Sequence, residues 1–382
     1  MSVGASDEER IAALRLARSA EIGPVTFRKL VDRFGSALAA IDALPELAQN
    51  SGRASQLRLQ SVAGAVCELE QADKIGARLL VQGDGVYPDL LAAAEGAPAI
   101  LFARGELATL MMPSIAIVGA RNASANGRKL AESLAAGLGA RGFVVVSGLA
   151  RGIDAAAHRG ALKTGTLAVL AGGIDRIYPE EHAELYEAIC DSGLIVSEMP
   201  FGQVARAADF PRRNRIIAGL AQGTVVVEAA ERSGSLITAR LAGEMGREVL
   251  AVPGSPLDAR CRGTNQLLKD GAVLVETVED IIASLPARAA QPPRPARRAD
   301  HIIEPRIREQ IAEPVRAKPV TATQPLPARL VELLGPSPTS IDDLVRATGA
   351  SAAEIQAALF DLEIEGVTLR HPGQLVSRAV KS

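Results

Sequence analysis

Six short segments rich in glycine and serine each follow a short apolar run in the middle of the chain. They are Gly119-Ala120-Arg121-Asn122, Ser147-Gly148-Leu149-Ala150-Arg151-Gly152-Ile153-Asp154, Ala171-Gly172-Gly173-Ile174-Asp175, Ser197-Glu198-Met199-Pro200-Phe201-Gly202, Ser233-Gly234-Ser235 and Pro253-Gly254-Ser255. Glycine lets backbone amides approach a phosphate, and arginine, here Arg121, Arg151 and Arg232, neutralises its charge. The alternative is that the glycines only make tight turns, which leaves the arginines and serines unexplained. The segments therefore predict a phosphate-bearing ligand.

A second basic feature is the start of the predicted helix in 210–220. Helix N-termini carry partial positive charge and favour acidic residues, so arginines are out of place there. The segment and its flank hold four of them, Arg206, Arg212, Arg213 and Arg215, beside Asn214 and Phe210. Asp209 is the one acidic neighbour in sequence. The excess of positive charge predicts that an anion from outside binds here.

The apolar residues of this helix predict how it lies. Ile216, Ile217 and Leu220 form one stripe at helical spacing, which we expect to be buried. Arg213 stands at the N-terminal end of that stripe, so we expect it to point over the mouth of the sheet.

The Gly-rich segments lack the usual nucleotide fingerprints. The turn at Gly119 has no G-x-G-x-x-G, and the strand before Ser147 does not end in the acidic residue that would hold a ribose hydroxyl. No G-x-x-x-x-G-K-[ST] is present either. We therefore expect a ligand that presents phosphates without an adenosine pocket.

Four residues have the chemistry of acid–base groups. Asp154 and His158 stand four apart on one predicted helix, and they either form a carboxylate–imidazole pair or, as we favour, hold the 147–158 loop by hydrogen bonds. Glu198 and Glu228 each follow a predicted strand. They are either catalytic carboxylates or the partners of nearby arginines, and the sequence does not decide between the two.

Composition narrows the class of protein. The 382 residues carry a net charge of −2, so nucleic-acid binding would require a local basic patch. Tryptophan is absent and aromatic residues make up 3%, which disfavours a surface built mainly of stacked aromatics. Three scattered cysteines predict neither disulfides nor a metal site. Without a signal pattern or a membrane-length apolar run, we expect a cytoplasmic protein that does not interact with membranes.

The predicted elements alternate between strand and helix through the middle of the chain. Short apolar runs lie at 115–118, 143–146, 167–170, 194–196, 224–227, 249–252 and 272–275, with weaker strand candidates at 78–81 and 99–102. Such alternation predicts a parallel α/β sheet with helices on both faces. Ligands of such sheets bind beyond the carboxyl ends of the strands, where the Gly-rich segments lie.

The flanking regions differ in composition from this core. Residues 1–72 are predicted to be helical, and the Gly23-Pro24 turn resembles a helix-hairpin-helix, although it also fits a plain bundle turn. Residues 73–285 form the Rossmann-like domain, and 286–327, with nine prolines, form an extended linker. In 328–382 three helices and a hairpin predict a winged helix. Its helix at 352–365 carries four acidic residues and no basic one, which favours protein contact over groove reading.

Together these motifs resemble the DNA-processing protein A (Smf) family. The matching runs are Val118-Gly119-Ala120-Arg121, 147–154 with His158, Tyr178-Pro179 with His182, Phe210-Pro211 with 213–217, 233–239, and Val252-Pro253-Gly254. The resemblance covers about 98–283, and its combination of motifs is specific.

The resemblance implies an extended Rossmann fold that binds single-stranded DNA, dimerises, protects incoming DNA in natural transformation and helps load the RecA recombinase. It implies no enzymatic activity and no cofactor or metal. The backbone phosphates would be held by Arg121 and the arginines of 212–215, Phe210 would lie against a base, and 264–283 would form the dimer. The full predicted DNA site is Gly119, Arg121, Ser147, Gly148, Arg151, Gly152, Phe210, Arg212, Arg213, Asn214, Arg215, Ser233, Gly234 and Ser235.

Two other functions remain open from the sequence. Gly-rich Rossmann-like sheets with a strand-end glutamate also resemble nucleoside-monophosphate phosphoribohydrolases, but the P-G-G-x-G-T-x-x-E signature of that family is absent here. The acidic helix at 352–365 would also fit a protein-interaction scaffold.

Overall fold

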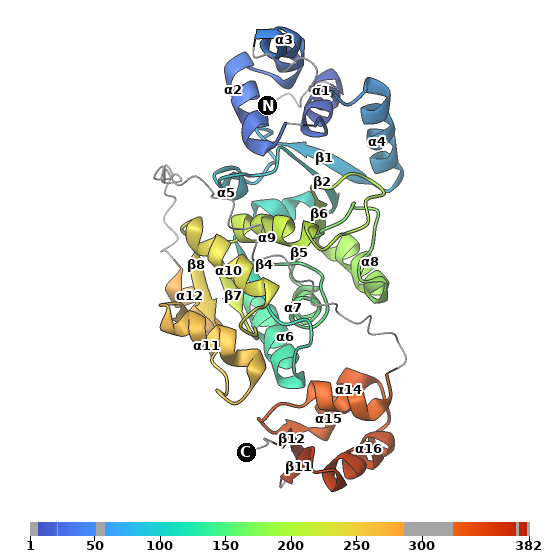
Figure 1. Ribbon diagram of the computed structural model, residues 1–382, viewed down its shortest axis with the longest axis vertical. Helices are drawn as coiled ribbons and strands as arrows, with labels where there is room; N and C mark the ends of the chain where they lie inside the picture. The colour runs from blue at the N-terminus through green and yellow to red at the C-terminus, as the bar shows by residue number, and fades with distance from the viewer. Residues whose placement is uncertain (1–6, 21, 51–57, 286–323, 372–373, 380–382) are drawn as a thin grey trace. The chain divides into compact units, whose positions relative to one another are not determined.

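The computed structural model of the chain describes residues 7–20, 22–50, 58–285, 324–371 and 374–379 (Figure 1). The chain divides into two compact units. One holds the N-terminal helices and a large sheet, and the other holds the C-terminal domain. The predicted linker at 286–327 lies outside the described residues up to residue 323.

The first region is helical, as predicted. Its helices are α1 (Asp7–Ala17), α2 (Pro24–Phe34), α3 (Ala37–Asn50) and α4 (Val62–Lys74). The Gly23-Pro24 turn starts α2, with the proline in the first turn, where its missing N–H costs nothing. Leu14, Phe27 and Ile41 are among the apolar residues buried between these helices.

The sheet has nine strands within the described residues, in the order β1-β2-β6-β5-β4-β3-β7-β8-β9. The strands are β1 (Ala77–Val81), β2 (Ile100–Gly105), β3 (Ser114–Val118), β4 (Val144–Ser147), β5 (Thr166–Val169), β6 (Leu194–Ser197), β7 (Gly223–Val226), β8 (Glu248–Ala251) and β9 (Val273–Leu274). From β6 to β9 all neighbours are parallel, whereas β1 and β2 extend the β6 edge in antiparallel pairing. The predicted α/β fold and the edge position of the two weaker strands are confirmed.

Both faces of the sheet are buried, so its central strands are apolar throughout. On β3, Ala116 and Val118 lie in the same core as Ile216 and Ile217 of α9, and Ile115 lies in the opposite core. The first face is covered by α5 (Asp89–Ala92), α9 (Asp209–Leu220), α10 (Gly234–Glu244) and α11 (Arg262–Lys269). The second face is covered by α6 (Ala125–Ala140), α7 (Ile153–Ala161), α8 (Ala183–Ser192) and α12 (Val278–Ser284). Three short 3₁₀ helices lie at Leu107–Met111, Glu180–His182 and Ala259–Cys261.

The C-terminal domain has three helices and a small sheet. They are α14 (Leu326–Leu333), α15 (Ile341–Thr348), α16 (Ala352–Ile364), β10 (Thr339–Ser340), β11 (Thr368–His371) and β12 (Leu375–Arg378), with β12 between the other two strands. Ser340 caps α15 by accepting from the Asp343 amide. Ser351 and Glu354 form a capping box at the start of α16.

Helix length and polarity bear on membrane insertion. No helix in the described part of the chain is long and apolar enough to cross a bilayer.

Candidate nucleic-acid interface

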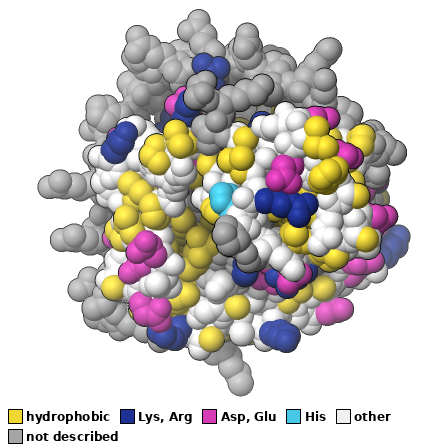
Figure 2. Space-filling model, turned by 90° about the horizontal axis from the view of Figure 1, so that it is seen from below, with side chains coloured by type: hydrophobic (Ala, Val, Ile, Leu, Met, Phe, Trp, Pro, Cys, Tyr) yellow, Lys and Arg dark blue, Asp and Glu magenta, His cyan; other side chains and the backbone are white. Residues whose placement is uncertain are grey.

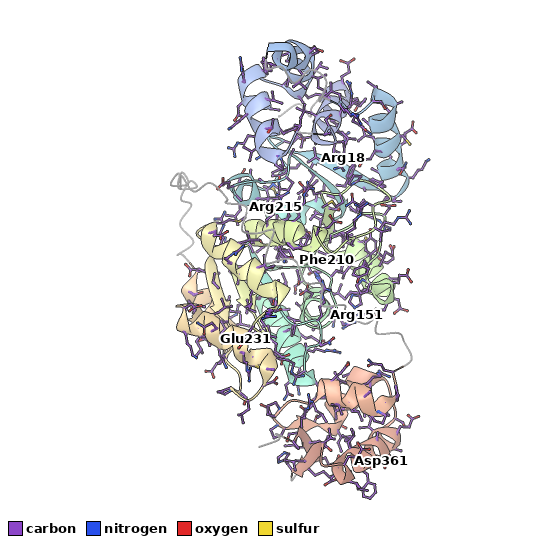
Figure 3. All side chains as sticks on the ribbon, viewed as in Figure 1. Arg18, Arg151, Phe210, Arg215, Glu231 and Asp361 are labelled. Carbon is purple, nitrogen blue, oxygen red and sulfur yellow. The ribbon has the colours of Figure 1, made fainter. Side chains whose placement is uncertain are left out.

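An arginine lies over an aromatic ring at the carboxyl ends of the strands. Arg121 follows β3, and its guanidinium carbon is 4.7 Å from the centre of the Phe210 ring in the first turn of α9. This is a cation–π contact, which holds an exposed guanidinium in a defined place. The Tyr178 ring packs edge-on against Phe210, with 5.7 Å between ring centres. Figure 3 labels Phe210 and also Arg151, which precedes α7.

Arg213 lies in the interior, which corrects the expectation that it points over the mouth of the sheet. It is 4% exposed and donates from Nη1 to the Val169 carbonyl at 3.0 Å. The helix stripe explains this, because positions 213, 216, 217 and 220 share one buried face. Burial lowers the pKa of Arg213 to about 10, while Asp154 acts in the opposite direction. The guanidinium therefore stays charged at neutral pH.

The loop between β4 and α7 closes over this buried arginine. A Cβ at Gly148 would lie 1.5 Å from Arg213 Nη1, so no other residue leaves room for the guanidinium. Gly152 has φ +76°, and a Cβ there would lie 2.2 Å from the Ala120 carbonyl oxygen. These glycines are required by close packing.

Asp154 sits below the same loop and binds its amides. One carboxylate oxygen, Oδ2, accepts from the amides of Gly148 at 3.1 Å and Ala150 at 3.4 Å. Burial raises the pKa of Asp154, and the charge of Arg213 opposes that rise. Because these two amides already have a partner inside the protein, they do not fit the expectation that the loop amides bind a phosphate.

Two buried histidines hold the residue between those amides. Leu149 has the unusual φ of +55°. Its amide donates to His158 Nε2 at 3.3 Å, and its carbonyl accepts from His182 Nδ1 at 3.0 Å. The proton of His158 is therefore on Nδ1, which donates to Thr166 Oγ1 at 2.7 Å. Burial lowers the pKa of His158 to about 3 and also lowers that of His182, so both rings are neutral. The hydrogen-bonding role favoured for Asp154 and His158 matches these contacts.

Glu198 partners the remaining arginines of α9. Its carboxylate accepts from Arg212 Nε at 3.2 Å and from Arg215 Nη2 at 2.6 Å. The backbone carbonyl of Glu198 accepts from Arg18 of the helical region at 2.8 Å, and Arg18 also pairs with Glu68. Arg18 and Arg215 are both labelled in Figure 3. These contacts favour the second alternative for Glu198, that it partners nearby arginines, and they leave less free positive charge on α9 than Asp209, the one acidic neighbour in sequence, suggested.

The other predicted residues have mixed surroundings. Arg151 forms a two-point ion pair with Glu181, with both N···O distances at 2.7 Å. Ser147 is fully buried and donates to the Ile117 carbonyl. Ser233 caps α10, its Oγ lying 2.7 Å from that of Ser235.

Two more of the predicted residues lie beside these. Asn214 donates to the carbonyl of Gly234, which is itself exposed. Gly119 lies against Ile153, where a Cβ would meet Cγ1 at 2.6 Å. The structure brings Arg121, Arg213, Gly148 and Phe210 together.

Charge on the molecular surface is mixed. On the face shown in Figure 2, the described Lys and Arg side chains are scattered among acidic and apolar ones. Among the described residues, no group of three or more His, Cys, Asp or Glu is placed to hold a metal ion. The basic groups near Phe210 are a local feature of the sheet edge.

Three family models together match most of this chain. The model for DNA recombination-mediator protein A matches residues 78–286, the DprA-like N-terminal HHH domain matches 7–71, and the DprA winged helix domain matches 314–374. The chain belongs to the DNA recombination-mediator protein A family. The resemblance inferred from the motifs is confirmed, as are the helix-hairpin-helix and winged-helix assignments.

Two relatives align with half or more of this chain. Protein Smf of Synechocystis sp. is 31% identical over 94% of this chain and 96% of its own length. DNA processing protein DprA of Streptococcus pneumoniae is 45% identical over 52% of this chain and 71% of its own length. Family membership places this chain among the DNA-processing proteins of recombination, which fits a non-enzymatic role.

Two solved structures of the family resemble this one. That of DNA processing protein A from Streptococcus pneumoniae has a TM-score of 0.62 and 34% identity, covering 74% of this chain and 99% of that one. That of DNA processing protein A from Helicobacter pylori, described for its single-stranded DNA binding mode, has a TM-score of 0.50 and 28% identity, covering 54% of this chain and 94% of that one.

Sequence reasoning gave no role to three residues that shape this region. Tyr178 and His182 appear only within matching motifs, and Arg18 was not considered. For Tyr178 the available signal was the presence of an aromatic residue within a matching motif in a chain that has few aromatic residues. The contacts of His182 and Arg18 join distant segments and leave no local pattern in the sequence.

Proposed function

We propose that this protein binds single-stranded DNA without chemically altering it, protects incoming DNA, and helps load the RecA recombinase in natural transformation and recombination. The observation that carries the proposal is the exposed Arg121 guanidinium over the Phe210 ring, because a backbone phosphate and a base need a cation and an apolar face side by side. The binding mode for which the Helicobacter pylori relative is described supports it.

The contacts divide the predicted residues into two roles. Arg121 and Arg212 are exposed, and in our proposal they bind phosphates directly. Arg213 is buried below the loop and contributes positive charge from within. Ser147, Gly148 and the other loop residues shape this surface through their internal hydrogen bonds and close packing. Glu198 holds the Arg212 side chain in place until DNA binds.

Partners and domain roles belong to the same proposal. The protein acts in the cytoplasm as a homodimer, with 264–283 at the interface. The domain boundaries at 72/73, 285/286 and 327/328 separate the helix-hairpin-helix, Rossmann-like, linker and winged-helix parts. RecA loading is measured as the rate of RecA filament assembly on single strands already covered by single-strand binding protein.

Fluorescence anisotropy with labelled oligothymidine tests the DNA-binding core of the proposal. We expect tight binding that weakens steeply with salt, because phosphate contacts release counterions. Arg121→Ala removes one charged contact and the cation over Phe210, so affinity falls about tenfold. The slope of log K against log salt falls by roughly 0.7 for one contact to a single strand.

Arg141→Ala is the matched control, because Arg141 is also exposed and pairs with Glu279 beyond the end of α6. It leaves affinity and salt slope unchanged. Wild-type binding no tighter than that of an acidic control protein refutes the proposal. Release of free base from nucleoside monophosphates would instead support the phosphoribohydrolase alternative.

A further inference from the structure

Tyr178 is an exposed aromatic side chain at the edge of the proposed DNA site. It is 50% exposed, and its ring packs against Phe210 at 61° between the ring planes. Phe210 in turn lies under the guanidinium of Arg121. A cation and two aromatic rings thus follow one another along the surface.

The other two tyrosines show that this exposure is unusual within the protein. Tyr87 is buried and donates its hydroxyl to the Pro98 carbonyl at 2.6 Å. Tyr186 is also buried and donates to the Ile174 carbonyl at 2.6 Å. Both have the packed ring and bonded hydroxyl of core tyrosines. Exposing half of a large ring forgoes that stabilisation, so the Tyr178 ring is available to a ligand.

The backbone holds Tyr178 firmly on both sides. Before it, the Asp175 carboxylate accepts from the Gly202 amide at 2.9 and 3.1 Å. After it, His182 donates to the Leu149 carbonyl. The segment is therefore tied to the loop that leads to α9 and to the loop over Arg213. A ring held in place before binding loses little entropy when a flat partner stacks on it.

We propose that the Tyr178 ring adds a nucleobase subsite beside Phe210, in which one base of a single strand stacks on Tyr178 while Arg121 takes a neighbouring phosphate. This subsite rests on the proposed DNA-binding function and adds Tyr178 to it. Stacking accepts any base, because every base has a π-face. Bases within a duplex are already stacked, so the subsite favours single strands over double strands.

The absence of tryptophan allows a direct test by intrinsic tyrosine fluorescence. We expect oligothymidine to quench the tyrosine fluorescence of wild type. Tyr178→Phe keeps the ring, so we expect it to bind within about twofold of the wild-type affinity but to lose most of the quenching. Tyr178→Ala loses roughly tenfold in affinity, within the range measured for removal of one stacked base. Phe360→Ala, at a 57% exposed aromatic of the C-terminal domain, is the matched control and leaves binding unchanged.

An abasic oligomer of equal length separates this subsite from the phosphate contacts. Wild type is expected to bind it at least about tenfold more weakly than oligothymidine, and Tyr178→Ala to show a smaller difference between the two oligomers. Equal wild-type affinity for the two oligomers, or Tyr178→Ala with undiminished affinity for oligothymidine, overturns the base subsite and leaves phosphate binding intact. Failure of wild type to bind either oligomer overturns the proposed function itself. Circular dichroism confirms that each variant is folded.

Discussion

Helices α9 and α16 differ in the sign of the charged residues that they carry. α9 begins without a side-chain cap and carries Arg212, Arg213 and Arg215 in its first two turns. α16, in the position of a winged-helix recognition helix, begins with the Ser351–Glu354 capping box and carries acidic residues down its length. Its surface also exposes Phe360 and Ile364.

The difference supports our proposal that α9, and not the helix in the recognition position, meets DNA. The start of α9 breaks the usual rule of helix-terminus electrostatics, and the buried Asp154 and Glu198 support its arginines from outside the helix. α16 obeys the rule at its N-terminus, where Glu354 stabilises the helix, whereas Asp361 and Glu363 near its C-terminus oppose the helix dipole. A helix that departs from its own electrostatic optimum is the better candidate for binding phosphate.

The largest effect expected from this comparison is on stability, at Arg213. Arg213→Ala leaves Asp154 buried without its positive neighbour and opens a cavity below Gly148. We expect a loss of about 3 kcal/mol in the free energy of unfolding, typical of removing one partner of a buried charged pair. Urea denaturation followed by circular dichroism measures it.

Arg212→Ala is the control on the same helix, because its side chain is 52% exposed. We expect it to cost less than about 1 kcal/mol, because Arg215 still pairs with the buried Glu198 carboxylate after the change. Equal losses in the free energy of unfolding for the two variants would show that the burial of Arg213 does not make it more important for stability than Arg212.

An intermediate effect is expected in the pH dependence of stability, through His158. The folded pKa of about 3 lies below the unfolded value of 6.5, so the unfolded chain takes up the proton first as pH falls. Stability from the neutral ring is therefore complete above pH 6.5 and is lost between 6.5 and 3. His158→Gln keeps an acceptor for the Leu149 amide and does not titrate.

We expect wild type to lose about 1.5 kcal/mol relative to His158→Gln when pH drops from 6.5 to about 5, measured by urea denaturation at each pH. His182, whose pKa shifts the same way, and Asp154, whose pKa shifts the opposite way, are present in both proteins and cancel in the difference. Parallel pH profiles for the two would mean that His158 takes up a proton as readily in the folded protein as in the unfolded chain.

The smallest effect is expected on α16. Replacing Asp361 and Glu365 with alanine changes affinity for oligothymidine by less than about twofold near physiological salt, because in our proposal these exposed charges do not contact the strand and are largely screened. Fluorescence anisotropy measures this change in affinity, and the larger loss expected for Arg121→Ala is the reference for comparison. A tenfold change in affinity would place α16 at the DNA and end the contrast between the two helices.

Much of the fold was predictable because its determinants are local. The strands β3 to β8 coincide with their apolar runs to within one or two residues, since a strand buried on both faces must be apolar throughout. The caps at Ser340 and Ser351 follow from side chains that bond amides three residues away. The clustering of Arg121, Gly148 and Phe210 at one edge of the sheet followed from the rule that parallel strands share one carboxyl edge.

The roles of individual residues were less predictable because they depend on segments far apart in the sequence. Arg213 was expected to point outward, yet the 148–150 loop covers it. Glu198 is separated along the chain from the arginines of α9. The residues near Asp209 therefore suggested more unpaired positive charge than remains once Glu198 pairs with Arg212 and Arg215.

The sequence by itself determined the α/β core, its flanking helical and winged-helix domains, and the edge of the sheet where glycines and arginines gather. These follow from periodicity and strand direction, which act over a few residues. Only the tertiary structure decided which of those groups face outward, leaving Arg121, Phe210 and Tyr178 at the surface and placing Arg213, Asp154 and His158 within. Burial and pairing depend on which distant segments pack together, and no short stretch of sequence carries that information.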